Sequence, residues 1–262
     1  MKAAREYLRR AASAGLAGEA AGFGFVADRC DDPFTGRRQI LVEYCSPGLP
    51  ASPAALDALR GALRARDHEA DAVLLRVDGD LRLPAPWRPR LTYVRHDRDP
   101  AAGTRGAPSP AGLTVRPAAR ADDARVHDWL VQAFRNAYPG QEIASEHPGV
   151  ADIMAAPDRL SFIAELHGEP IGHGTVLISE QDSVTGEEFT ELVDTLVDDA
   201  RHRRAAVAAL VAAAVEAAGG RPLCGHVVHP YEPGAARAAD NVLRALVAGD
   251  WSVDHCFWES PW

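Results

Sequence analysis

The sequence predicts a mixed α/β fold in two unequal parts, in which a mostly antiparallel sheet is flanked by helices. From residue 113 onward, stretches with the period-2 pattern of strands alternate with stretches that have helical periodicity. Antiparallel strands come first and a β-α-β crossover follows, an order that a narrow set of architectures shares. Residues 97–112, rich in Pro, Gly and Ala, have the composition of a linker. We therefore expect an N-terminal domain over 1–96 and a larger domain over 113–262.

The composition is that of a protein with a substantial core, because 47% of the 262 residues are hydrophobic and 25% are charged. The net charge of −9 excludes a surface that generally coats nucleic acid. The four cysteines are far apart in the chain, and their spacing predicts reduced thiols and no metal site. No stretch is apolar enough for a signal peptide or a membrane span, so we expect a cytoplasmic protein with no membrane partner.

The elements of the larger domain follow from periodicity and turn signals. Val126, Leu130 and Phe134 form the inward face of an amphipathic helix, and His167-Gly168-Glu169 is a hairpin turn signal. Gly219-Gly220 is a helix stop. In chain order we expect a strand over 113–118, a helix over 121–140, strands over 160–166, 170–179 and 191–197, a helix over 205–218, a strand over 223–229, a helix over 235–247 and a last strand or hairpin over 251–262.

The first 96 residues repeat part of this pattern. We expect strands over 38–45, 72–79 and 89–97, and a helix over 52–67 that Ser52 caps. Strand, turn, helix, strand, strand is also the order from Glu191 to the C-terminus. The pattern therefore predicts a partial internal duplication.

Residues 113–262 resemble a domain of the GNAT acyltransferase superfamily, whose members move an acyl group from coenzyme A to an amine. The family pattern Gln/Arg-x-x-Gly-x-Gly/Ala falls on residues 203–208, RRAAVA, where Arg203 and Ala208 match and Ala206 replaces a usual glycine. Asn241 and Gly249-Asp250-Trp251 resemble the late helix and its exit, although this helix lacks the family's tyrosine. The N-terminal domain would be a truncated GNAT-like repeat, as in tandem members.

The resemblance implies a turn that binds the pyrophosphate of acetyl-CoA or another acyl-CoA. Unpaired N–H groups and the helix dipole at a helix start favour an anion there. The expected contacts are Leu196, Val197, Arg203, Arg204, Ala205, Ala206, Val207, Ala208 and Asn241. The residues alone leave an alternative open, a solvated turn before an alanine-rich helix packed on the sheet. If the turn binds coenzyme, Ala206→Asp is expected to abolish binding and leave the fold intact.

Direct attack of an amine on the thioester needs donors for the oxyanion and a base for the ammonium proton. The resemblance places the oxyanion donors among the backbone amides of 193–197. Asp194 is the first candidate base because it interrupts an apolar strand, and Glu191 is expected on the opposite side of that strand. His173 is a second candidate, and Tyr231 is a candidate acid for the leaving thiolate. A structural or solvated role stays open for each of them.

The acceptor is expected to be the amine of a small molecule. Glu142, Glu146 and His147 lie in a loop where such folds receive the acceptor, and His226 lies on a nearby strand; solvation is the alternative for these loop residues. Two other functions stay open. A transferase of the same fold that takes an aminoacyl group from tRNA would explain the arginine clusters, although the acidic total opposes it. A non-catalytic ligand-binding protein would explain the altered turn.

Overall fold

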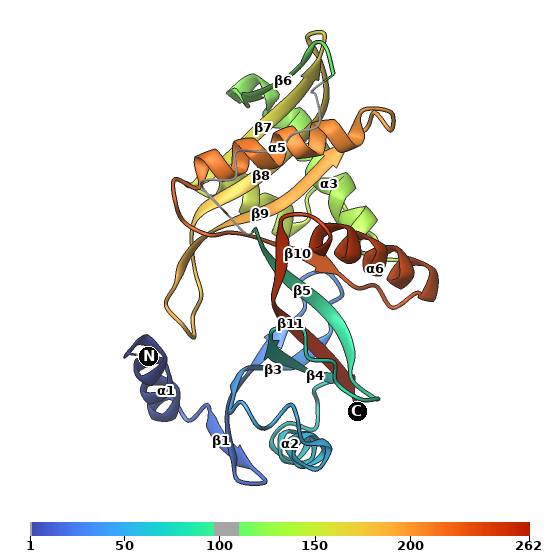
Figure 1. Cartoon of the computed structure of the whole chain (residues 1–262). Coiled ribbons are helices and arrows are strands. Elements are labelled where there is room, and N and C mark those ends of the chain that lie inside the picture. Colours follow the sequence, from blue (N-terminus) through green and yellow to red (C-terminus); the bar gives the residue numbers. More distant parts are fainter. Residues whose placement is uncertain (1, 97–109) are drawn as a thin grey trace.

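The computed structural model describes residues 2–96 and 110–262 (Figure 1), so most of the predicted linker over 97–112 lies outside the described residues. The helices are α1 (Lys2–Ser13), α2 (Pro53–Arg66), the 3₁₀ turn η1 (Arg120–Asp122), α3 (Asp123–Ala137), α4 (Pro148–Ala155), α5 (Arg203–Ala217) and α6 (Pro233–Val247). The strands are β1 (Ala17–Ala20), β2 (Phe23–Asp31), β3 (Arg38–Cys45), β4 (Ala72–Asp78), β5 (Arg88–His96), β6 (Leu113–Pro117), β7 (Arg159–Leu166), β8 (Glu169–Gln181), β9 (Glu188–Val197), β10 (Leu223–Val228) and β11 (Trp251–Pro261).

All of these strands belong to one mixed sheet, with the order β1-β2-β3-β4-β11-β5-β10-β9-β8-β7-β6. The last strand of each part pairs with a strand of the other part: β5 lies next to β10, and β11 lies next to β4. β11 pairs with β4 and β5, and β5 pairs with β11 and β10, all in antiparallel fashion. The two parts therefore exchange strands at the centre of the sheet, where β5 and β11 run side by side (Figure 1). The predicted boundary divides the chain without dividing the sheet.

The sheet is symmetric about the β11/β5 pair. Moving outward, β4, β3, β2 and β1 on one side match β10, β9, β8 and β7 on the other, and β6 is added at one edge. β3/β4 and β9/β10 are the two parallel pairs, and α2 and α5 make the two connections. This repeated strand order is the arrangement that the predicted duplication would produce.

The repeat extends to two details that the sequence pattern did not predict, the turn of a hairpin and a β-bulge after it. The β2–β3 and β8–β9 hairpins turn through Asp32–Gly36 and Asp182–Gly186, and in each the aspartate Oδ1 accepts the N–H groups two and three residues on. Both glycines have positive φ, 65° and 71°. Each hairpin is followed by a β-bulge, at Glu43 in β3 and at Val193 in β9. The two halves thus share their turn chemistry as well as their topology.

Most predicted elements are present, and four that the sequence did not reveal are α1, α4, β1 and β2. The strand and helix predicted over 38–45 and 52–67 agree with β3 and α2, including the cap at Ser52, whose side chain accepts the Ala55 N–H. The missed β2 carries charged residues at its outer end, and α1 has a long polar face, so neither shows a clear apolar period. None of the helices in the described ranges has the length and apolar character needed to cross a membrane.

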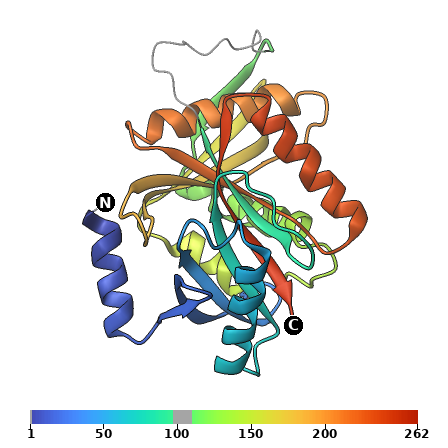
Figure 2. The ribbon, with the colours of Figure 1, turned by 60° about the horizontal axis from the view of Figure 1, so that its bottom comes forward.

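Helices pack on both faces of the C-terminal half of the sheet. α5 covers one face, where Ala206, Leu210 and Ala214 pack against β7, β8 and β9. α3 and α4 cover the other face, with Val126 and Leu130 fully buried as predicted. In Figure 2 the two halves of the molecule lie on either side of the central strands β5 and β11. This half of the sheet is therefore covered by helices on both of its faces.

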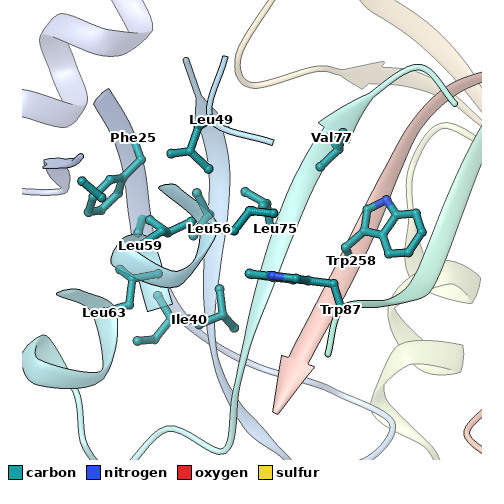
Figure 3. Close-up of a cluster of buried hydrophobic side chains, with 14 of the residues drawn as sticks. Phe25, Ile40, Leu49, Leu56, Leu59, Leu63, Leu75, Val77, Trp87 and Trp258 are labelled. Atoms are coloured by element: carbon teal, nitrogen blue, oxygen red, sulfur yellow. The ribbon is translucent and has the colours of Figure 1, made fainter. Parts of the chain in front are cut away.

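The N-terminal half has its own core, which α2 closes. Leu56, Leu59 and Leu63 come from one face of α2 and meet Leu49 and Leu75 from the sheet side (Figure 3). Trp258 of β11 joins this cluster, so the exchanged strand contributes to the core of the half it enters. Burial of the Trp258 side chain, worth about 2 kcal/mol, stabilises the exchange of β11 into this half.

Candidate active site

The candidate site is a cleft where β9 and β10 separate. These parallel strands pair from Thr190 and Leu223 only as far as Leu192 and Gly225, and beyond that point the remaining residues of both strands diverge. A cleft of about 490 Å³ occupies the gap and is lined by β9, β10, α3, α5 and α6. The backbone of 193–196 borders this cleft, so its peptide groups are available to a ligand.

The bulge in β9 corrects one expectation from the sequence. Strict alternation places Glu191 and Asp194 on opposite faces, because they are three residues apart. Glu191 pairs with Leu177, however, and Asp194 pairs with Thr175, two residues away on β8, because Val193 is an extra residue. Both carboxylates therefore lie on the same face of the sheet, the one that α3 covers.

Each of these carboxylates lies beside a histidine. His173 of β8 is fully buried, and its Nε2 is 2.9 Å from Asp194 Oδ2. His226 of β10 is partly exposed, and its Nδ1 is 3.2 Å from Glu191 Oε1. Asp194 and His226 both line the cleft. The structure thus brings together three residues that the sequence predicted separately, and it adds Glu191.

Asp194 is the more enclosed of the two carboxylates. Its side chain is 11% exposed and both of its oxygens are buried. Apart from the close approach of His173, these oxygens have no hydrogen-bond partner of regular geometry in the described part of the chain. A buried carboxylate without such partners is costly in a core residue and is characteristic of functional sites.

Alternate residues of β8 point to opposite faces of the sheet, so His173 and the glycines on either side of it face in opposite directions. Gly172 and Gly174 face α5, and a Cβ on Gly172 would lie 2.4 Å from the Leu196 carbonyl oxygen. A Cβ on Gly174 would lie 3.5 Å from Leu210 Cβ of α5. Glycine at 172 therefore lets β8 and β9 approach closely, while the intervening His173 points to the α3 face.

The turn between β9 and α5 presents backbone donors one turn before Val207, the first residue of α5 that lines the cleft. Ala206 N–H makes the first bond to His202 O, so the amides of Arg203, Arg204 and Ala205 precede the helical ladder. Just before them, Asp199 accepts the N–H groups of 201 and 202, and its pKa is lowered chiefly by a hydrogen bond with the His202 side chain. Three amides thus lie at the positive end of the helix dipole, an arrangement that can bind an anion.

Ala206 does not take the place that the sequence comparison assigned to it. Its side chain is fully buried in the core beneath α5, and its N–H is already bonded. Ala206→Asp would bury a carboxylate in this core, so the expectation of an intact fold is wrong. Arg203 and Arg204 are exposed at the helix start, and Arg203 Nε donates to Val197 O at 3.2 Å. Val207 lines the cleft, whereas Ala208 is exposed.

Two predicted site residues lie away from the cleft. The Tyr231 hydroxyl donates to the fully buried Glu259 at 2.6 Å and accepts from Arg37 at 2.5 Å. This network holds the hydroxyl beside the β2–β3 hairpin, which argues against a role as acid for the thiolate. Asn241 is exposed on α6 and accepts a hydrogen bond from Arg244. Neither residue is among those that line the cleft.

The predicted acceptor loop lies where the N-terminal half contacts the C-terminal half. Glu142 and Glu146 are exposed, whereas the His147 Nδ1 accepts the Gly149 N–H and caps α4. Phe34, at the tip of the β2–β3 hairpin, stacks on His147 and on Tyr138 with ring centroids 4.9 and 4.3 Å apart. Tyr138 also lines the cleft. Sequence reasoning missed Phe34 because only the strand exchange brings it here.

Fold and cleft together define an α/β domain with a cleft between two separated parallel strands. Residues 124–237 match the model of the acetyltransferase (GNAT) family. The C-terminal half of the chain therefore carries a GNAT acetyltransferase domain, as the resemblance predicted. A search among curated proteins found no match.

Solved structures similar to the chain include several of this class at low sequence identity. A GCN5-related N-acetyltransferase from Kribbella flavida is 18% identical, with a TM-score of 0.43 over 99% of this chain and 96% of that one. A GCN5-related N-acetyltransferase from Sphaerobacter thermophilus is 17% identical, with a TM-score of 0.49 over 93% and 78%. A tandem GNAT protein from the clavulanic acid biosynthesis pathway is 17% identical, with a TM-score of 0.44 over 93% and 81%.

Proposed function

We propose that the protein is an N-acyltransferase that moves an acyl group, in the first instance acetyl, from coenzyme A to the amine of a small molecule. One observation carries this proposal. The cleft between β9 and β10 is lined by Val207, one turn into α5, whose amides at 203–205 precede the helical ladder, and by Asp194 and His226, one member of each carboxylate–histidine pair. A donor with an anionic head and an extended arm fits this arrangement.

The anionic head of the donor binds at the start of α5. The amides of Arg203, Arg204 and Ala205 point toward it with the helix dipole behind them. The exposed guanidinium groups of Arg203 and Arg204 add charge-assisted contacts to the pyrophosphate. The apolar walls of the cleft, including Val207 and Val211, enclose the arm that carries the thioester.

The chemistry takes place beside the bulge in β9. The amine nitrogen attacks the thioester carbonyl carbon, the C–S bond breaks, and coenzyme A leaves as the thiolate. Backbone N–H groups on the separated edge of 193–196 stabilise the oxyanion. Asp194 accepts the ammonium proton, and His226, held by Glu191, orients the incoming amine.

Acyl-CoA is favoured over aminoacyl-tRNA as the donor. The cleft is an open, mainly apolar groove of about 490 Å³, a size suited to a slender arm. A tRNA needs a broad basic surface around such a groove, and the chain carries a net charge of −9.

Release of free coenzyme A thiol, measured with a panel of small primary amines, tests the proposal. We expect turnover with at least one amine and acetyl-CoA. Asp194→Asn should lower kcat, whereas Glu191→Gln should mainly raise the KM for the amine. Two results would refute the reading: no stabilisation of the fold by any acyl-CoA, or binding of acyl-CoA that Arg203→Glu and Arg204→Glu leave unchanged.

A further inference from the structure

Behind Asp194, a continuous row of buried polar groups crosses the α3 face of the sheet. Asp194 is followed by His173 on β8, then Thr175 on the same strand, then Ser161 on β7, and finally Arg159. The separations are 2.9 Å from Asp194 Oδ2 to His173 Nε2, 3.3 Å from His173 Nδ1 to Thr175 Oγ1, 2.9 Å from Thr175 Oγ1 to Ser161 Oγ, and 3.1 Å from Ser161 Oγ to Arg159.

The row is buried except at its outer end. His173 and Thr175 are fully buried, and Ser161 is 6% exposed. Trp129 of α3 lies parallel to the His173 ring, with centroids 5.3 Å apart and planes 12° apart. Arg159 also pairs with Asp123 at 2.9 Å, near a surface cavity that Ser161 helps to line. His173 Nδ1 and the hydroxyls of Thr175 and Ser161 each have a hydrogen-bond partner within the row, as polar groups at this depth usually do.

Arginine determines the direction of the hydrogen bonds along this row. A guanidinium only donates, so the Ser161 hydroxyl accepts from Arg159 and has its own proton to give. Thr175 Oγ1 lies 2.9 Å away, and when Ser161 donates to it, the Thr175 hydroxyl is left to donate to His173 Nδ1. With Nδ1 as the acceptor, the ring proton lies on Nε2, which faces the Asp194 carboxylate.

We propose that Arg159, Ser161 and Thr175 are positioning residues, which hold His173 with its proton on Nε2 and thereby orient the Asp194 carboxylate as proton acceptor. This inference rests on the proposed function for the role of Asp194. The tautomer itself is a property of the free protein. Charged and aligned donors strengthen one another along such a row.

The tautomer of His173 in the free protein is measured with long-range ¹H–¹⁵N correlation spectra. We expect the spectra to show Nε2 protonated and Nδ1 unprotonated. Thr175→Val removes the donor to Nδ1 at nearly constant volume, so it should disturb this pattern, and Thr175→Ser should restore it. A proton on Nδ1 in the wild-type chain would overturn the proposal, whether or not acyl transfer is observed.

Kinetics of the same variants provide the second readout. Thr175→Val should lower kcat roughly tenfold, the size of one hydrogen bond, and leave the KM for acetyl-CoA unchanged. Thr175→Ser should rescue kcat. The matched control is Thr190→Val, because Thr190 is also fully buried on the sheet and donates to the Ile178 carbonyl; its kcat should not change. Equal effects of Thr175→Val and Thr190→Val, or loss of stability alone, would refute the proposal while leaving the proposed function in place.

Discussion

The two halves of the sheet share a hairpin, a bulge, a parallel strand pair and a connecting helix, yet in the described residues the cleft that opens between the two parallel strands lies in the C-terminal half. Beside β9 the space is bordered by α6 and remains open. The N-terminal half has no helix between β4 and β5, and Leu49 and Leu56 are completely buried in its core. The same architecture therefore leaves a cleft between the parallel strands in one half and is filled by packed side chains in the other.

The N-termini of α2 and α5 also differ, in the number of backbone amides that they leave without a partner in the helix. Ser52 and Pro53 begin α2; the serine side chain takes the Ala55 N–H, and proline has no N–H. Only the amide of Ala54 is left over. At α5 no side chain caps the helix, and three amides remain. Besides α6, the halves thus differ in a pair of residues at a turn and in the residue after each bulge, which is Tyr44 in β3 and Asp194 in β9.

The largest expected effect comes from the residue after the bulge. Asp194→Asn removes the proton acceptor and should lower kcat by about 10²- to 10⁴-fold, the usual contribution of a general base. Tyr44→Phe, at the matching place in β3, should leave steady-state kinetics unchanged. An active Asp194→Asn variant would assign the proton to the pair of Glu191 and His226.

The next effect comes from copying the α2 cap onto α5. His202→Ser with Arg203→Pro reproduces the order Ser52-Pro53 and reduces three free amides to one. Acetyl-CoA affinity should fall roughly 100-fold, because two hydrogen bonds to a charged group are lost. Competition binding measures this, and circular dichroism checks that the helix content is kept. Unchanged affinity would remove the anion site from this turn.

A smaller effect is expected from the two hairpin tips. Phe34→Ala removes aromatic stacking on Tyr138 and His147 and should lower the free energy of unfolding by about 2–3 kcal/mol. Val184→Ala, at the matching position of the other hairpin, should cost about 1 kcal/mol. Urea unfolding of both variants tests the difference. Equal losses would mean that the two hairpins contribute alike to joining the halves.

The smallest effect concerns the free energy of unfolding at acid pH. It arises in the central β5/β11 pair, where Asp254 lies on β11. A hydrogen bond with His255, aided by Arg95, lowers the Asp254 pKa to about 2. Because the folded pKa is below the unfolded one, the stabilisation is present above about pH 4 and is lost as the pH falls toward 2. Asp254→Asn should flatten the stability profile in this window. A profile as steep as that of the wild-type chain would show that Asp254 does not contribute.

Much of this fold followed from periodicity, because strands such as β3 and helices such as α2 carry apolar faces and clear caps. The bulge at Val193 did not, since an extra residue in a strand leaves no mark on composition. It changed the face on which Glu191 lies. The contacts of Tyr231 and Phe34 depend on an exchange of strands between the halves, and such long-range pairing has no local sequence signal.

The claim that one half binds and the other packs is tested most directly by counting bound donors. Native mass spectrometry of the full chain with excess acetyl-CoA should show one molecule per chain. The variant that combines His202→Ser with Arg203→Pro should show none under the same conditions. Two molecules per chain, or one molecule retained in the variant, would contradict the account.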